Sequence, residues 1–241
     1  MRYTHSGSGE TISISWLGFT LAVIPAALII LIGVLQPSPK ERIEQQTQIF
    51  LTRLSIGDTI HLKETFTQNL SERFTSQEIL EFSERENITP LKTWAIHNSY
   101  HFKQKGLANV QTPQGIIRLD YVGKMAGWKL QNFCQVNRFT EETASSFVNH
   151  LRLGNLEAAQ RMTVDAAFPR RQGRQFPSER LQKLHKRLKE SSSEVLPGKL
   201  SLPGTHNYHQ AVKVDDTNLV VRLHHWRYNR SGCQFFVFDI Y

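Results

Sequence analysis

Residues 50–58 read FLTRLSIGD, and residues 147–155 read FVNHLRLGN. Both stretches place apolar side chains at helical spacing and then reach a glycine that is followed by Asp58 or Asn155. A glycine here is typical of a left-handed residue that ends a helix, and Asp or Asn can cap the helix that follows. The sequence therefore predicts the same pair of helices in two places, 97 residues apart.

Two further pairs of segments repeat in the same order. They are residues 74–79 (FTSQEI) with 176–181 (FPSERL), and residues 127–130 (GWKL) with 232–235 (GCQF). The offset grows from 97 to 102 and then to 105 residues, as expected for related units that differ in loop length. We therefore predict two homologous domains, at residues 40–136 and 138–241.

Each predicted unit changes its period along the chain. Helical spacing comes first, and we expect Ser76 and Ser178 to cap the third helix of their units. The period then becomes two, over residues 117–121 and 219–223, with turn sequences between the strands. Helices followed by antiparallel strands predict the α+β class, with helices packed on one face of each sheet.

The N-terminal part contains a long apolar run. Residues 12–35 read ISISWLGFTLAVIPAALIILIGVL, without a charged side chain, and about 20 such residues can cross a bilayer as a helix. The run exceeds a signal-peptide core and lacks a small-residue cleavage site at its end. We therefore predict a tail (1–11) and a transmembrane helix (12–36), with Trp16 at an interface, Pro25 in mid-span and Leu35 at the exit.

Positive charge is concentrated in one segment. The net charge is +8, and residues 161–189 contain nine basic side chains against two acidic ones. The rest of the chain is nearly neutral, which argues against a general nucleic-acid binder. The predicted partner-binding patch consists of Arg170, Arg171, Arg174, Arg180, Lys183 and Arg187. It would bind an acidic subunit or anionic lipid headgroups, and the alternative is a solvated face above a leucine stripe.

No pattern for catalysis stands out. The chain lacks a nucleophile elbow and a phosphate-binding glycine loop. The two cysteines, Cys134 and Cys233, are too few for a disulfide framework, and we expect buried thiols more than a bridge.

Histidines are the remaining candidates for chemistry. The late ones are His206, His209, His224 and His225. Two of these are adjacent on a predicted strand and would point to opposite faces, so we expect no metal site and no cofactor. An acid–base pair drawn from Asp120, His97 or His101 is a weaker alternative.

The repeated pattern resembles the nuclear-transport-factor-like (SnoaL or cystatin-like) cone fold. The resemblance rests on Phe50, Leu54, Gly57, Asp58 and residues 126–130 of the first unit. The second unit keeps Phe147, Leu151, Gly154 and Asn155 but has Cys233 in place of the tryptophan. The resemblance implies two tandem domains over residues 40–241, in each of which helices pack on a curved antiparallel sheet.

The layout resembles inner-membrane assembly proteins of type IV secretion machines, which have a tail, one anchor and a periplasmic cone domain. The resemblance implies a non-catalytic, single-pass membrane subunit that docks on or scaffolds a larger membrane complex. It favours an extracytoplasmic position, whereas the lysine and arginine count around the anchor slightly favours the cytoplasm. The alternative is a membrane-anchored small-molecule binder or enzyme that uses the cavity of one cone.

Overall fold

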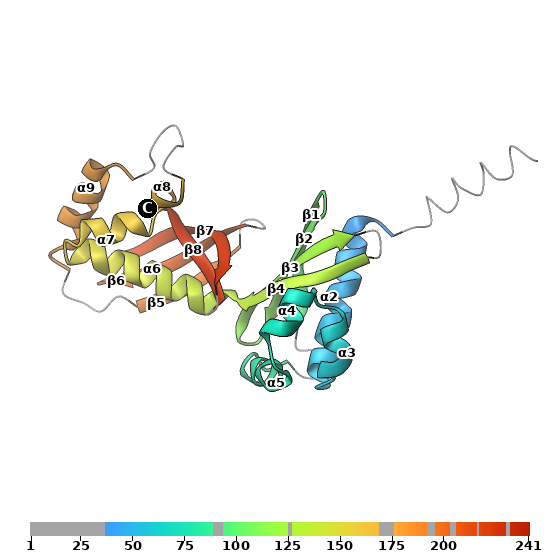
Figure 1. Cartoon of the computed structure of the whole chain (residues 1–241). Coiled ribbons are helices and arrows are strands. Elements are labelled where there is room, and N and C mark those ends of the chain that lie inside the picture. Colours follow the sequence, from blue (N-terminus) through green and yellow to red (C-terminus); the bar gives the residue numbers. More distant parts are fainter. Residues whose placement is uncertain are drawn as a thin grey trace, which may run out of the picture. The chain divides into compact units, whose positions relative to one another are not determined.

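The computed structural model describes residues 37–88, 94–124, 127–168, 176–191, 196–202, 206–215, 217–229 and 232–241. Residues 39–241 form one compact unit. It contains two four-stranded antiparallel sheets with strand orders β1-β2-β3-β4 and β5-β6-β7-β8 (Figure 1). We call residues 39–135 the N-terminal lobe and residues 136–241 the C-terminal lobe.

The two lobes contain the same elements in the same order. The N-terminal lobe consists of α2 (Pro39–Ser55), α3 (Thr59–Glu64), α4 (Gln68–Arg73), α5 (Ser76–Arg85), β1 (Ala95–Phe102), β2 (Lys105–Thr112), β3 (Gly115–Lys124) and β4 (Gly127–Gln135). The C-terminal lobe consists of α6 (Val136–Arg152), α7 (Leu156–Arg161), α8 (Val164–Ala167), α9 (Ser178–Leu188), β5 (Leu196–Ser201), β6 (Asn207–Val214), β7 (Thr217–Asn229) and β8 (Gly232–Ile240). The repeat predicted from the sequence therefore has a structural counterpart.

The first helix of each lobe ends as its sequence predicts. Gly57 and Gly154 follow α2 and α6 with φ values of +71° and +77°, where a side chain would be strained. The Asp58 carboxylate accepts a hydrogen bond from the His61 backbone N–H and caps α3. Asn155 precedes α7 but makes no side-chain cap hydrogen bond.

The predicted serine caps are wrong by one residue. Thr75 caps α5, and its hydroxyl and the Glu78 side chain form a reciprocal capping box. Pro177 stands at the matching position before α9 and provides no side-chain cap. Ser76 and Ser178 are instead the first residues of these helices.

Each lobe fills the space between its helices and its sheet with side chains. In the N-terminal lobe, Phe50, Phe66 and Phe133 form a cluster with ring centroids 5.8 to 6.2 Å apart. In the C-terminal lobe, Phe147 and Val148 of α6 are fully buried in the cluster that includes the sheet. Burial of such rings is the main stabilising contribution of each core.

The predicted fold class is right in being α+β but wrong in containing a transmembrane helix. Within the part of the chain that the structure describes, no helix combines the length and the apolar character that a membrane span needs. Both α2 and α6 have 17 residues and include charged side chains, because each buries only one face. The run at 12–36, with Trp16, Pro25 and Leu35, lies outside the described residues. The interpretation as a single-pass membrane protein is therefore not supported.

The sheet of the N-terminal lobe is buried on both faces at its centre. Along β2, five consecutive residues at 106–110 are buried, and along β3 so are residues 115–119. Ala108 and Val110 belong to the core under the helices. Leu107 and Asn109 alternate with them and therefore lie on the opposite, helix-free face. This second buried face contains the candidate site.

Candidate functional site

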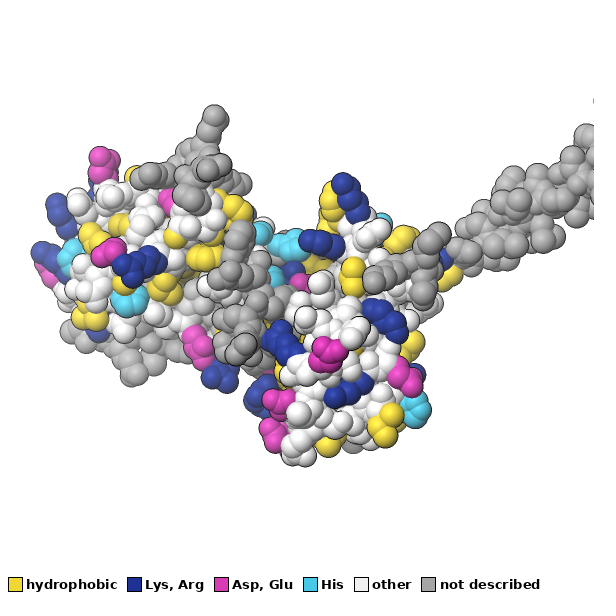
Figure 2. Space-filling view, viewed as in Figure 1, with side chains coloured by type: hydrophobic (Ala, Val, Ile, Leu, Met, Phe, Trp, Pro, Cys, Tyr) yellow, Lys and Arg dark blue, Asp and Glu magenta, His cyan; other side chains and the backbone are white. Residues whose placement is uncertain are grey.

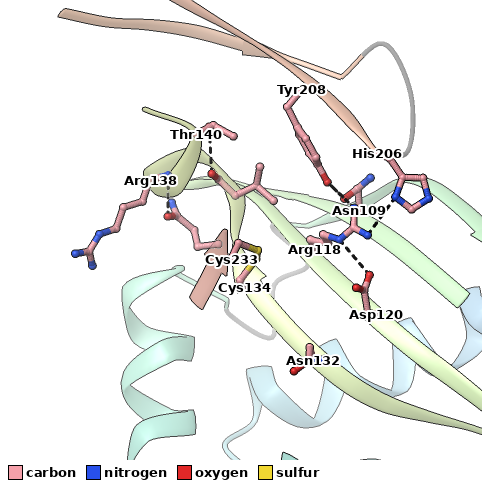
Figure 3. Close-up of a disulfide and its surroundings, with 12 residues drawn as sticks. Asn109, Arg118, Asp120, Asn132, Cys134, Arg138, Thr140, His206, Tyr208 and Cys233 are labelled. Carbon is pink, nitrogen blue, oxygen red and sulfur yellow. Dashed lines mark hydrogen bonds and ion pairs between the residues drawn. A yellow bond between two sulfur atoms is a disulfide. The ribbon is translucent and has the colours of Figure 1, made fainter. Parts of the chain in front are cut away.

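A disulfide joins the helix-free face of the first sheet to the second sheet. Cys134 of β4 and Cys233 of β8 are bonded, with Cα atoms 5.9 Å apart, and both are buried (Figure 3). The expectation of two thiols is therefore wrong. The two residues are 99 apart in sequence, so their meeting depends on how the lobes pack and not on local spacing.

Arg118 of β3 lies beside this link and is buried, with 3% of its surface exposed. Its Nε atom lies 3.1 Å from Oδ1 of Asp120, and it donates a hydrogen bond of 3.0 Å to the Tyr208 hydroxyl of β6. The Tyr208 hydroxyl in turn donates to Oδ1 of Asn109 at 3.2 Å. One guanidinium is thus bonded to both lobes (Figure 3).

These contacts compensate the cost of burying a charge. A guanidinium removed from water is unfavourable unless an opposite charge and hydrogen bonds replace its hydration. Asp120 supplies the charge, and the Tyr208 hydroxyl supplies an acceptor. Burial raises the pKa of Tyr208, which keeps its phenol protonated at neutral pH and able to donate to Asn109.

Two histidines of the C-terminal lobe complete the cluster. Nη2 of Arg118 donates a hydrogen bond to Nδ1 of His206 at 3.4 Å. Burial and the nearby Arg118 charge lower the pKa of His206 to about 4. The same two causes hold the pKa of His225, on β7, well below its usual range. Both imidazoles are therefore neutral at pH 7.

A pocket of about 620 Å³ adjoins the cluster. Its lining includes three cationic side chains, one carboxylate and the two neutral histidines, namely Arg73, Lys105, Arg118, Asp120, His206 and His225. Tyr100 and Phe102 of β1 add two aromatic rings that are 44% and 59% exposed. Figure 2 shows histidine and basic side chains gathered where the lobes meet. The volume lies within the range of small-molecule sites.

The charge of the lining favours one class of ligand. Three cations against one carboxylate leave an excess of positive charge, which favours an anionic ligand. Tyr100 also packs edge-on against His206, with ring centroids 6.0 Å apart, so aromatic surface and polar groups share one wall.

The predicted basic patch is only partly described. Arg170, Arg171 and Arg174 lie outside the described residues. Arg180 is engaged within the lobe, because it pairs with Asp239 of β8 and stacks on the Phe176 ring at 4.7 Å. Lys183 and Arg187 are exposed on α9, as a docking surface requires.

The weaker alternative, an acid–base pair within one cone, is not assembled. His97 and His101 are exposed on β1, and no contact with Asp120 is found for either among the described interactions. Asp120 instead pairs with Arg118. In the described part of the chain, no group of three or more potential ligand residues could hold a metal ion.

Analysis of the sequence named Asp120 and His206 but missed Arg118, Tyr208 and Asn109, although a signal for Arg118 exists. Residues 116–121 read IIRLDY and residues 220–225 read VVRLHH, which places Arg118 and Arg222 at matching positions of the two lobes. Apolar residues also lie next to one another at 106–110 and 115–119, which is typical of strands buried on both faces. A polar side chain in such a strand needs a buried partner.

Comparisons of the chain with protein-family models, with curated proteins and with solved structures found no match. The resemblance to the cone fold therefore stays a prediction, and the function is argued from the site alone.

Proposed function

We propose that this chain is a non-catalytic binding protein whose junction pocket takes an anionic ligand with an aromatic part. The observation that supports this proposal is the composition of the lining, where three cations face one carboxylate beside two exposed aromatic rings. The anionic group lies near Lys105 and Arg73, while the aromatic part stacks against Tyr100 and Phe102. Arg118 positions the side chains of the pocket wall and does not bind the anionic group, because its charge is already paired with Asp120.

Two exposed lysines give a matched test. Lys105 lines the pocket, whereas Lys213 of β6 is exposed and does not line it. We expect phenyl phosphate or benzoate to bind the wild-type chain, and Lys105→Gln to weaken that binding about fivefold. Lys213→Gln should leave it unchanged. Isothermal titration calorimetry measures both, with benzyl alcohol as the uncharged control. The proposal fails if no aromatic anion binds, or if the two variants weaken binding equally.

A second, docking function is favoured by the exposed face of α9. Lys183, Lys186 and Arg187 are exposed there, and no ion pair of these three is found among the described residues. Uncompensated positive charge on one helix face fits an acidic surface of a partner subunit. Under this hypothesis the chain is a non-catalytic scaffold, and the α9 face contributes to its contact with a larger complex.

The docking hypothesis predicts loss of a defined partner on charge reversal. Lys183→Glu with Arg187→Glu should release subunits that co-purify stoichiometrically with the wild-type chain. Lys213→Glu, an exposed site on β6 of the same lobe, is the control and should retain them. Retention by the double variant would rule out α9 as the contact.

A further inference from the structure

The four outer edges of the two sheets differ in how their backbone groups are satisfied. On β4, Leu130 exchanges hydrogen bonds of 2.8 Å with Thr65 and Thr67, so this edge is covered by the segment between α3 and α4. On β8, Val237 donates to the Met162 carbonyl at 2.8 Å, and Thr163 forms a bridge to the same residue. Matching segments of the two lobes thus close matching edges.

The other two edges do not match. The β5 edge contains Pro197, which has no backbone N–H to offer, and its pairing with β6 is irregular between Pro197 and Leu200. Proline and local irregularity are common ways of protecting an exposed strand. The equivalent strand β1 has eight residues and no proline, so it lacks the first of these protections.

The outer edge of β1 stays open in the described structure. None of the backbone hydrogen bonds of the described residues involves 95–102 outside its ladder with β2. A groove of about 490 Å³ runs beside the strand and is lined by residues 94–99 together with Lys40, Glu44 and Gln48 of α2. β1 bulges between Ile96 and Asn98, after which residues 98–102 pair regularly. In this regular segment every second residue directs its backbone N–H and C=O away from β2, and these groups form a template for another strand.

The composition of β1 indicates which strand fits. Its sequence, AIHNSYHF, contains no lysine, arginine, aspartate or glutamate. When two copies of one strand pair antiparallel across a two-fold axis, a residue at the axis meets its own copy, and a residue next to the axis lies diagonal to its own copy. Like charges near the axis would therefore repel. An uncharged strand avoids this cost. We infer that β1 pairs antiparallel with β1 of a second copy of this chain, which joins two four-stranded sheets into one of eight strands.

Charge substitution at His101 tests this pairing. His101 is exposed and lies within the regular segment, so its two copies would lie opposite or diagonal to each other. Sedimentation velocity of the full-length chain over a range of concentrations should show a reversible dimer. His101→Lys and His101→Glu should each raise the dissociation constant about tenfold. An equimolar mixture of the two variants should restore dimers, because opposite charges then meet.

Matched changes on another surface provide the control. Gln182→Lys and Gln182→Glu alter an exposed residue of α9 and should leave the dissociation constant unchanged. Circular dichroism verifies that every variant is folded. A wild-type chain that remains monomeric at all concentrations overturns the inference, as does a dimer that both His101 variants retain. The readout is mass, so the result is independent of whether the pocket binds an anion.

Discussion

Arg118 of β3 and Arg222 of β7 occupy matching positions in the two lobes, yet the surroundings of the two side chains differ. Arg118 is buried at the junction and bonded to Asp120 and Tyr208. Arg222 is only partly buried and stacks on the Phe238 ring at 4.7 Å. The lobes differ because the C-terminal lobe covers the helix-free face of the first sheet. A repeated sequence thus gave two equal frameworks, and the packing between them made one face a site.

Strand burial shows the same asymmetry. Residues 106–110 of β2 are all buried, whereas β6 alternates buried residues with half-buried or exposed ones along its length. In β2 both faces have a neighbour, and in β6 only the helix-covered face is fully packed. The junction is therefore part of the interior of the N-terminal lobe, and loss of the junction should cost that lobe more stability than the other.

The largest effect is expected from breaking the link between the lobes. Cys134→Ser with Cys233→Ser removes a bridge that closes a loop of about 100 residues, which should lower the free energy of unfolding by about 4 kcal/mol. Urea denaturation followed by far-ultraviolet circular dichroism measures this loss. We also expect one cooperative transition to become two, since the lobes can then unfold separately. An unchanged midpoint would show that the junction holds without the bridge.

The second largest effect is the difference in stability loss between substitutions of Arg118 and Arg222. Arg118→Met leaves the Asp120 carboxylate half-buried without its partner and should cost about 3 kcal/mol. Arg222→Met removes a partly exposed side chain that stacks on a ring and should cost below about 1 kcal/mol. Chemical denaturation of both variants gives the comparison. Equal losses would contradict the different burial of the two residues.

The junction should also weaken in acid. The pKa of His206 is about 4 in the folded chain, below the ordinary value of 6.5, so the unfolded chain binds more protons between these values. The contribution of His206 to the free energy of unfolding is fully present above pH 6.5 and is lost as the pH falls toward 4. Because His206 is only partly buried, we expect a loss of about 1 to 2 kcal/mol. His206→Asn should flatten this slope in unfolding measured at several pH values.

The smallest effect is expected at the starts of α5 and α9, the last helices of the two lobes. Thr75→Ala removes the capping box of α5 and should cost about 1 kcal/mol. Ser178→Ala, at the start of α9, should change stability by no more than about 0.3 kcal/mol, because Ser178 is not a cap. Thermal denaturation compares the two melting temperatures. A larger loss for Ser178→Ala would mean that the start of α9 is assigned wrongly.

The features that were predicted correctly are those that depend on local sequence patterns. Gly57 and Gly154 end their helices as expected, because a positive φ follows from the chain itself. The α+β class follows from the change of period, and the repeat follows from the matching segments of the two halves. The disulfide was not predictable, because no local pattern tells which distant strands meet. The burial of Arg118 was missed because alternation with apolar neighbours also describes a strand with one solvated face. The membrane helix was expected from composition, and the described helices do not support it.

Chemical modification of the two arginines tests the central claim most directly. Phenylglyoxal reacts with accessible guanidinium groups, and peptide mass spectrometry reports each site separately. In the oxidised chain we predict that Arg118 is protected while Arg222 and the exposed Arg187 react. Arg118 should become reactive when Cys134 and Cys233 are replaced by serine. Equal modification of Arg118 and Arg222 in the intact chain would contradict the packing of the C-terminal lobe on the first sheet, and with it the pocket.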